Sequence, residues 1–338
     1  MTQMQAVFFS ETGTPDVLQL GEFPRPVPQA GEVLVEVAAV SVNPIDTYIR
    51  SGAVAAELPP RAIPGCDLAG TVVAVGEAVT EFQIGDRVWG SNQGLAGRQG
   101  TFAEFCSVAE QWLYPVPEEV DFELAAAGAL TGITAHLGLF LHAGLRSGEV
   151  VFVNGGSGGV GSAVVQLAKA AGATVITTAG SAEKASLCLA AGADHVIQYR
   201  SEDVSSRLAE ITARTGLIHV WFETLRNPSP AQSIPLLAKR GRLVLMAGRD
   251  ARPEFPVGPF YVKDLRLIGF AMFNASAEEQ RQTAAELNRL LATGAWKPGI
   301  GARFPFSQAA AAHRLQEENT LHNAGTLTGK IILTPQSR

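Results

Sequence analysis

The stretch Glu149–Gly172, EVVFVNGGSGGVGSAVVQLAKAAG, decides the fold of this chain because it joins a strand to a helix through a glycine-rich turn. Val150–Val153 is an apolar run rich in β-branched residues, which is typical of a strand that is buried on both faces. Apolar residues then recur at helical spacing from Val160 to Ala171, and Gly172 supplies a stop signal. The stretch therefore predicts the first strand–turn–helix unit of a parallel α/β sheet.

Three glycines of the turn, Gly156, Gly158 and Gly161, satisfy the G-x-G-x-x-G pattern. Side chains at these positions would block the tight turn, the approach of a pyrophosphate or the packing of the helix on the strand. Backbone N–H groups and the positive helix end then hold the anion. A glycine-rich turn that binds nothing is the alternative, but the flanking strand and helix favour dinucleotide binding. The expected contacts are Asn154, Gly156, Ser157, Gly158, Gly159, Val160 and Gly161.

Length and composition indicate a two-domain soluble enzyme. The chain has 338 residues, of which 46% are apolar and 17% charged, and its formal net charge is −6. Because no long run of Lys or Arg is present, we expect neither nucleic acid nor an anionic membrane as a partner. The three cysteines, Cys66, Cys106 and Cys188, form no CxxC pair, so a reducing cytoplasm is the expected location.

Two segments raise the question of membrane targeting. Met1–Ser10 alternates like a strand and lacks the basic-then-apolar order of a signal peptide. Leu124–Leu141 is long and apolar, but it contains glycines, threonines and a histidine. We therefore expect a buried helix there and no transmembrane segment.

The pattern of expected secondary structure changes near residue 123. Before it, short alternating strands such as Val33–Val37, Thr71–Val75 and Arg87–Trp89 are separated by glycines, which indicates a small β-barrel. After it, helices alternate with buried strands, which indicates a doubly wound parallel sheet. The expected elements are strands 174–178, 195–197, 218–222, 243–246 and 265–270 and helices 183–191, 204–215 and 229–238.

The end of the chain is expected to return to the first domain. Ala277–Ala292 has the pattern of an amphipathic helix, and Lys330–Leu333 reads as a final strand. We therefore predict a discontinuous barrel domain, residues 1–123 and 276–338, around a dinucleotide-binding domain, residues 124–275.

The second strand of the α/β unit indicates which nicotinamide cofactor is bound. NAD-specific units usually carry Asp or Glu at its tip, whereas this strand ends Thr177-Thr178-Ala179-Gly180-Ser181. Ser181, Lys184, Tyr199 and Arg200 follow and suit the 2′-phosphate of NADPH, since a charge-assisted hydrogen bond contributes about 1.5–3 kcal/mol. The alternative is that Lys184 and Arg200 are solvated surface groups. NADPH is the predicted cofactor.

Six motifs extend the argument from one unit to nearly the whole chain. They are VNPIDTYIRSG (Val42–Gly52), PGCDLAGTVVAVG (Pro64–Gly76), GDRV (Gly85–Val88), LTGITAH (Leu130–His136), NGGSGGVG (Asn154–Gly161) and LTGKIIL (Leu327–Leu333). In this order they resemble the zinc-independent, zeta-crystallin-like quinone oxidoreductases of the medium-chain dehydrogenase/reductase superfamily.

The resemblance implies a GroES-like β-barrel domain and a Rossmann domain with a cleft between them. It also implies reduction of quinones or conjugated carbonyls by NADPH, and a homodimer or homotetramer. Asn43, Asp46 and Tyr48 correspond to the family's active-site segment, although turn chemistry and barrel packing are alternatives for Asn43 and Tyr48. Further cofactor contacts implied by the resemblance are Thr131, Gly248, Phe273 and Lys330.

The resemblance extends to zinc-dependent alcohol dehydrogenases, so each ligand position matters. Asn43 stands near their first cysteine ligand, Gly65-Cys66-Asp67 replaces Gly-His-Glu, and Gly128-Ala129-Leu130 occupies the third ligand region. Catalytic zinc needs about three N, S or O ligands from the protein. We therefore expect no metal.

Two other functions remain open from the sequence. The same scaffold supports enone or enoyl-thioester reduction, in which a C=C bond is reduced instead of a quinone. Crystallin-like and RNA-binding roles also occur among similar proteins, although the net charge of −6 disfavours RNA. Whether electrons are transferred singly or as hydride is not determined by the residues.

Overall fold

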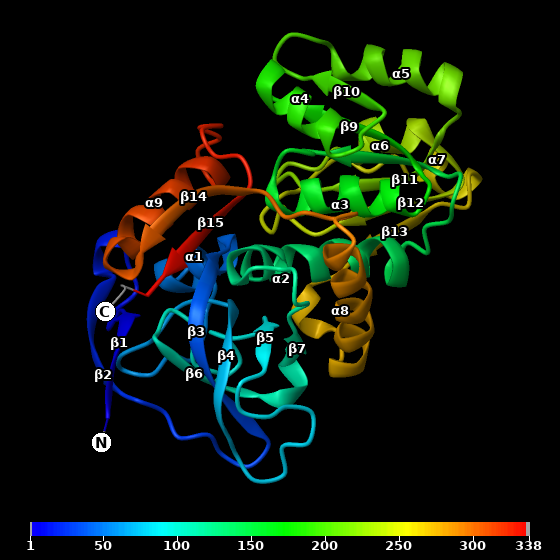
Figure 1. Cartoon of the computed structure of the whole chain (residues 1–338). Helices are drawn as coiled ribbons and strands as arrows, with labels where there is room; N and C mark the ends of the chain where they lie inside the picture. The colour runs from blue at the N-terminus through cyan, green and yellow to red at the C-terminus, as the bar shows by residue number, and fades with distance from the viewer. Residues whose placement is uncertain (1, 336–338) are drawn as a thin grey trace. The chain divides into compact units, whose positions relative to one another are not determined.

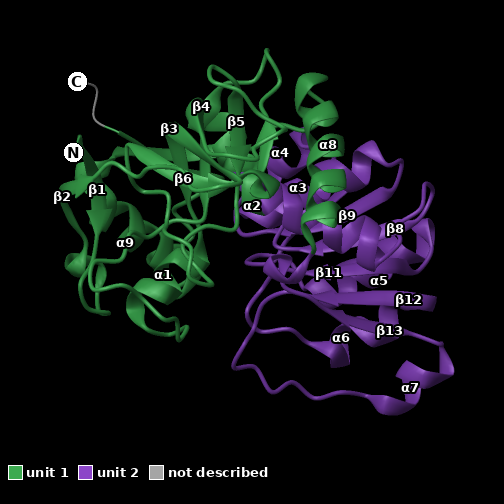
Figure 2. Ribbon diagram, turned by 90° about the horizontal axis from the view of Figure 1, so that it is seen from below, with its two compact units in different colours: residues 1–130, 276–338 green, residues 131–275 purple. Residues whose placement is uncertain are grey.

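The computed structural model describes residues 2–335. The chain forms two compact units, one of residues 1–130 with 276–338 and the other of residues 131–275, shown in different colours in Figure 2. We refer to them as unit 1 and unit 2.

Unit 1 is built on a seven-stranded sheet with the order β14-β15-β3-β4-β5-β7, in which β6 also pairs with β3. A separate two-stranded sheet pairs β1 with β2 (Figure 1). The strands are β1 (Gln3–Phe8), β2 (Gln19–Pro24), β3 (Glu32–Val42), β4 (Asp67–Val75), β5 (Arg87–Gly90), β6 (Phe105–Ala109), β7 (Leu113–Pro115), β14 (Ile300–Pro305) and β15 (Lys330–Thr334).

The alternation predicted around Val33–Val37 lies within β3, the longest of these strands. Its inward side chains form one core with those of β1, β4 and β15, and Val35, Val40 and Leu68 are fully buried in it. Ile331 and Leu333 of β15 pair with Val42 and Val40 of β3, so the C-terminal segment returns to this sheet. The helices are α1 (Pro44–Ser51), α8 (Ala277–Ala292) and α9 (Ala309–Thr320), with 3₁₀ turns η1 (Pro15–Val17), η2 (Glu110–Trp112) and η5 (Phe306–Gln308).

Unit 2 holds a six-stranded sheet with the order β10-β9-β8-β11-β12-β13, and every pairing in it is parallel. This is the doubly wound order of a dinucleotide-binding fold, which confirms the predicted fold class. The strands are β8 (Val150–Asn154), β9 (Thr174–Ala179), β10 (His195–Gln198), β11 (Ile218–Glu223), β12 (Leu237–Leu245) and β13 (Arg266–Gly269). The helices are α3 (Gly159–Ala170), α4 (Ala182–Ala190), α5 (Val204–Thr215), α6 (Pro230–Leu236) and α7 (Val257–Val262), with the 3₁₀ turn η4 (Met272–Asn274).

One boundary in unit 2 differs from the prediction. The helix expected over 229–238 is the shorter α6, and β12 begins at Leu237, earlier than expected. Pro235 lies in the last turn of α6, and a proline there has no N–H to continue the helix. The chain therefore turns into the strand directly after it.

The apolar segment around Leu124–Leu141 forms α2 (Phe122–His136), which continues into the π-helical turn η3 (Leu137–His142). By length and composition alone, Phe122–His142 is able to cross a membrane, but 72% of its most apolar window is buried within the protein. This burial confirms the expected core helix.

An ion pair fixes the turn that precedes β8. Arg242 of β12 donates from Nη1 and Nη2 to the two carboxylate oxygens of Glu149, at 2.8 and 2.6 Å. Its Nε and Nη2 also donate to the carbonyl oxygens of Ala143 and Gly144. Partial burial acts to raise the pKa of Glu149, but hydrogen bonds from Arg242 and the Arg146 backbone outweigh it and hold this pKa below its usual range.

We predict that Arg242→Gln lowers the free energy of unfolding by about 3 kcal/mol at pH 7, because Glu149 is left partly buried without its partner. Since the folded-state pKa of Glu149 is lowered, its contribution is present above the unfolded pKa of about 4.3 and is lost as pH falls through the folded pKa. The difference between the two proteins should therefore shrink below about pH 4. Urea unfolding across pH measures this, and Arg289→Gln, in an exposed pair with Glu286, is the matched control without an expected effect. Equal losses in both variants would contradict the prediction.

Candidate functional site

The predicted phosphate loop connects β8 to α3, and each fingerprint glycine has its own surroundings. A Cβ on Gly156 would lie 2.1 Å from Thr177 Oγ1, and one on Gly161 would lie 2.0 Å from the Gly155 carbonyl oxygen. Packing alone therefore requires glycine at both positions. A Cβ on Gly158 would meet only the Gly155 oxygen, at 3.5 Å, and Gly158 is exposed. The space beside Gly158 is therefore open, which would let a ligand approach the backbone closely.

The first turn of α3 supplies the donors for that ligand. Gly158 caps the helix, so the N–H groups of Gly159, Val160 and Gly161 precede the first residue with a helical acceptor. The positive end of the helix dipole adds to these groups. The loop therefore fits the pyrophosphate of a dinucleotide.

The side chain of Asn154, at the end of β8, is directed at neighbouring strand ends. Its Nδ2 donates to Glu223 Oε2 at 3.0 Å, and its Oδ1 accepts from Thr178 Oγ1 at 3.0 Å. Asn154 is thus part of the support of the loop.

The four residues expected at the 2′-phosphate lie together at the ends of β9 and β10. Ser181 caps α4 by accepting from the Lys184 N–H, and a Cβ on Gly180 would lie 2.5 Å from the Tyr199 hydroxyl oxygen. Burial and then the nearby Arg200 guanidinium lower the pKa of Lys184. Two cations in mutual repulsion form a favourable environment for an anion.

The remaining predicted residues of unit 2 lie in separate segments. Thr131 is buried in α2, Gly248 follows β12 with a φ of +86°, and Phe273 lies in η4. Their roles in cofactor binding stay predictions.

Unit 1 gathers Asn43 and Lys330 into a buried polar cluster. Lys330 Nζ donates to Asn43 Oδ1 at 2.5 Å and to the Val42 carbonyl oxygen at 2.7 Å. Asn43 Nδ2 donates to Asp67 Oδ2 at 2.7 Å. Burial lowers the pKa of Lys330, while Asp67 and Asp46 act to raise it. The Asn43 amide is therefore held at both ends, with an ammonium on one side and a carboxylate on the other.

Asp46 holds the start of α1, in the same segment as Asn43. Its Oδ2 accepts from the Asn43 backbone N–H at 2.7 Å and so caps α1. Burial raises its pKa to about 7, although the Cys66 thiol and the Asn43 N–H act to lower it. Tyr48, two residues further along α1, is half-buried.

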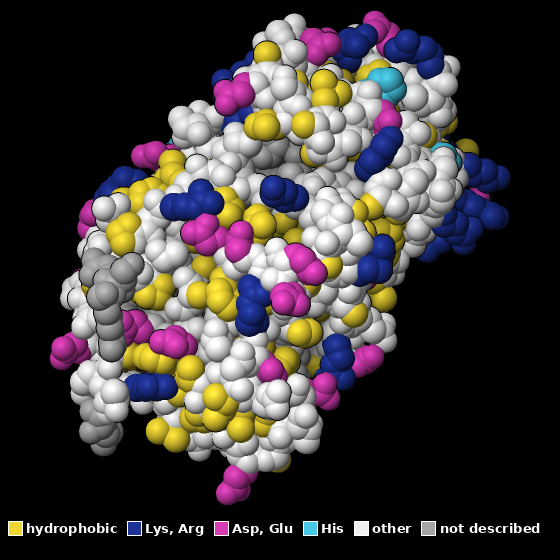
Figure 3. Space-filling view, viewed as in Figure 1, with side chains coloured by type: hydrophobic (Ala, Val, Ile, Leu, Met, Phe, Trp, Pro, Cys, Tyr) yellow, Lys and Arg dark blue, Asp and Glu magenta, His cyan; other side chains and the backbone are white. Residues whose placement is uncertain are grey.

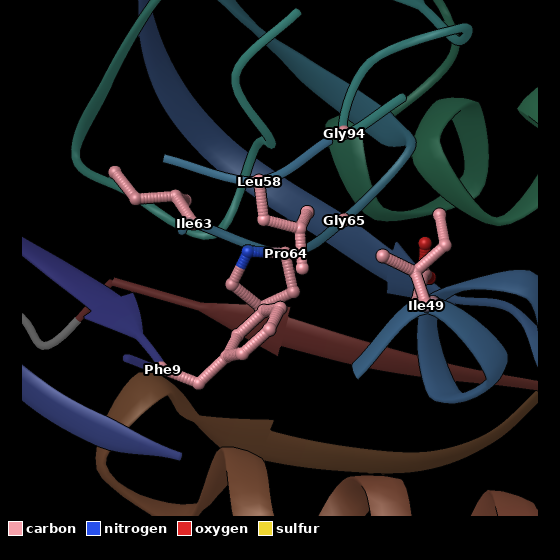
Figure 4. A pocket seen from close by; sticks show the side chains of 8 residues that line it. Phe9, Ile49, Leu58, Ile63, Pro64, Gly65 and Gly94 are labelled. Atoms are coloured by element: carbon pink, nitrogen blue, oxygen red, sulfur yellow. The ribbon is translucent and has the colours of Figure 1, made fainter. Parts of the chain in front are cut away.

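A small pocket borders Asp46 and lies wholly within unit 1. The side chains of Phe9, Leu58, Ile63 and Pro64 line it (Figure 4). Within residues 2–335, Asp46 Oδ1 has no hydrogen-bond partner, and a protonated Oδ1 is consistent with the raised pKa. Its apolar walls leave Asp46 as the ionisable group of the pocket.

The positions that correspond to zinc ligands hold a different chemistry. The side-chain amide of Asn43 is hydrogen-bonded to both Lys330 and Asp67. Burial raises the pKa of the Cys66 thiol well above its ordinary value. Within the described part of the chain, no group of three His, Cys, Asp or Glu side chains could hold a metal ion.

Sequence reasoning missed the residues that support the site. Glu223 and Thr178 hold the phosphate loop from neighbouring strands, and Asp67 accepts from Asn43 and from the hydroxyl groups of Ser41 and Ser91. For Glu223, the available sequence signal was an acidic residue at the end of the largely apolar strand β11.

Comparisons with known proteins cover nearly the whole chain. Residues 29–118 match the family described as "Alcohol dehydrogenase GroES-like domain", and residues 159–291 match "Zinc-binding dehydrogenase". The quinone oxidoreductase of Homo sapiens is 35% identical over 331 residues, covering 98% of this chain and 97% of the human protein.

Two solved structures extend this similarity. A mycobacterial quinone oxidoreductase is 34% identical with a TM-score of 0.83, covering 98% of this chain and 100% of that one. The quinone oxidoreductase of Escherichia coli complexed with NADPH is 30% identical with a TM-score of 0.84, at the same coverage.

We predict that Asp46→Asn gains stability relative to the wild type as pH rises from 4 to 7. Unfolded Asp46 ionises above about pH 3.9, whereas the folded residue keeps its proton up to about pH 7. Between these two pH values the unfolded state binds fewer protons than the folded state. The free energy of unfolding of the wild type therefore falls with rising pH by up to about 4 kcal/mol, whereas that of the variant does not.

Urea unfolding at four pH values between 4 and 7 measures the difference. Asp203→Asn is the matched control, because hydrogen bonds from Ser206 lower the pKa of Asp203, so that it is ionised in both states over most of this range and its effect should stay nearly constant. A difference between wild type and Asp46→Asn that does not vary with pH would contradict the prediction.

Proposed function

This chain belongs to the quinone oxidoreductases of the medium-chain dehydrogenase/reductase superfamily, and on that premise we propose that it transfers reducing equivalents from NADPH to a quinone without a metal ion. The family resemblance predicted from the motifs is thereby confirmed. The main support for this proposed activity is the 35% identity to human quinone oxidoreductase over 98% of the chain.

The surroundings of Lys184 support NADPH as the cofactor. β9 ends without a carboxylate, and Ser181, Lys184 and Arg200 offer a hydroxyl and two cations where a 2′-phosphate would lie. The loop glycines and the first turn of α3 would hold the pyrophosphate. When bound, NADPH supplies the hydride or the electrons.

The remaining residues receive roles by the family resemblance. Residues 1–123 with 276–338 form the catalytic domain, and residues 124–275 bind the nucleotide. The Tyr48 hydroxyl donates a hydrogen bond to the substrate oxygen, so Tyr48→Phe should lower kcat. Asn43 and Asp46 position the start of α1, the helix that carries Tyr48. Thr131, Gly248 and Phe273 contact the nicotinamide end of the cofactor, and Lys330 acts through Asn43.

The partner is a small molecule in the cytoplasm. The net charge is −6, and acidic and basic side chains are interspersed over most of the face shown in Figure 3. All three cysteines are buried and free, as suits a reducing compartment.

We also propose a homodimer or homotetramer joined through unit 2. Among the described strands, β13 pairs only with β12, and Leu267 on it is 45% exposed. Tyr261 and Val262, just before it in α7, are 67% and 68% exposed. An unpaired edge beside exposed apolar side chains suits pairing with a second copy. Light scattering that reports a single-chain mass would reject this assembly.

A spectrophotometric screen tests the activity. NADPH and NADH oxidation is followed with ortho-quinones, naphthoquinones, 2-alkenals and an enoyl thioester, with and without a chelator. Quinone turnover with NADPH, unaffected by the chelator, is the expected result. Faster turnover of the 2-alkenal or the enoyl thioester would replace the proposal with C=C reduction.

We predict that Lys184→Ala raises KM for NADPH about tenfold and leaves KM for NADH within about twofold, because one charge-assisted hydrogen bond to the 2′-phosphate contributes about 1.5–3 kcal/mol. Initial rates with both cofactors measure this. Lys239→Ala, which removes an exposed cation paired at 4.0 Å with Asp264, is the matched control. Equal changes for NADPH and NADH would remove Lys184 from the 2′-phosphate site.

A further inference from the structure

A buried carboxylate lies at the end of the strand next to the phosphate loop. Glu223 is the last residue of β11 and is 2% exposed. In the parallel pairing of β11 with β8, Glu223 is the register partner of Asn154, the residue that opens the loop. The two side chains therefore meet at the carboxyl edge of the sheet, where open α/β sheets bind their ligands.

A directional chain of hydrogen bonds leads from the loop to this carboxylate. The Gly155 N–H donates to Thr178 Oγ1 at 2.8 Å, the Thr178 hydroxyl donates to Asn154 Oδ1 at 3.0 Å, and Asn154 Nδ2 donates to Glu223 Oε2 at 3.0 Å. Each donor in the chain fixes the orientation of the next group. Only an acceptor can end it, and an ionised carboxylate is a pure acceptor.

Other contacts hold the carboxylate itself in place. Trp221 Nε1 donates to Oε2 at 3.2 Å, and the Leu225 N–H donates to Oε1 at 2.9 Å. Burial raises the pKa of Glu223, and the donors from Asn154, Leu225 and Trp221 act to lower it. Three donors therefore converge on two oxygens, so an uncharged group of the same shape cannot satisfy all of them.

The chain of hydrogen bonds decides which loop donors face a ligand. The N–H groups of Gly155 and Gly156 are both taken by Thr178, through its hydroxyl and its carbonyl oxygen at 3.1 Å. The start of the loop is thus tied to β9, while the first turn of α3 keeps its donors directed outward. A loop fixed in this way loses less conformational entropy when it binds an anion.

We propose that Glu223 is a positioning residue for the dinucleotide pyrophosphate, acting through Asn154 and Thr178 to hold the phosphate loop in its binding conformation. The inference rests on the proposed function, because it assumes that the loop binds NADPH. It assigns Glu223 no contact with the cofactor or the substrate.

The test compares NADPH affinity, turnover and loop protection in the full-length protein. Glu223→Gln should raise the Kd for NADPH, measured by fluorescence titration, about tenfold, while kcat at saturating NADPH stays within about twofold. Asn154→Ala should raise the Kd for NADPH by a similar factor. The double variant should be no weaker than the weaker single variant, because both changes break one chain.

A measurement without cofactor separates positioning from direct contact. Hydrogen exchange of the loop amides in the free protein should accelerate in Glu223→Gln, because Asn154 and the Thr178 hydroxyl that accepts from Gly155 are no longer held in orientation. Thr212→Val is the matched control, since it removes a buried hydroxyl that donates to the Leu208 carbonyl oxygen in α5, away from the loop. It should leave both Kd and loop exchange unchanged.

Each outcome decides for or against the inference. If Glu223→Gln does not fold, Thr178→Val breaks the same chain at a strand position that accepts valine, and it should raise the Kd by a similar factor. An unchanged Kd in the variants that fold, or losses that multiply in the double variant, would overturn the role of Glu223. Wild-type protein that does not bind NADPH would instead overturn the proposed function.

Discussion

The close approach of α3 to β8 is the constraint on which the nucleotide-binding unit depends. A Cβ on Gly161 would overlap the Gly155 carbonyl oxygen at 2.0 Å, so any larger residue would push the helix away from the strand. Since the helix begins directly above the end of β8, its first N–H groups project from the carboxyl edge of the sheet. The geometry of the phosphate loop is therefore a consequence of backbone packing.

The two units use buried polar groups for different purposes. In unit 2, the chain from Gly155 to Glu223 has one direction and ends in a carboxylate, so it orients a backbone segment. In unit 1, the ammonium of Lys330 and the carboxylate of Asp67 lie on opposite sides of the Asn43 amide. Their charges offset each other through that amide, which stabilises a buried cation and a buried anion without direct contact.

The sequence predicted the features that depend on residues close together in the chain. Helices 204–215 and 277–292 match α5 and α8 because Asp203 and Ser276 cap them and their apolar stripes are regular. The phosphate loop was found because its glycines are adjacent in sequence. Glu223 and the contact of Lys330 with Asn43 were not found, because these partners are separated by 69 and 287 residues. Such pairs depend on strand order and register, which periodicity does not contain.

The cluster in unit 1 also explains in chemical terms why these residues do not suit a metal. Both oxygens of Asp67 accept hydrogen bonds, from Ser41 and Asn43 at Oδ2 and from Ser91 at Oδ1. Asn43 Oδ1 faces the ammonium of Lys330, a cation that would repel a second one. Asp46 and Cys66 remain, and burial raises both of their pKa values, so each gives up its proton less readily than in water, as a metal ligand must. Asn43 and Asp67, at positions that correspond to zinc ligands, are therefore held by each other, by Lys330 and by the hydroxyl groups of Ser41 and Ser91.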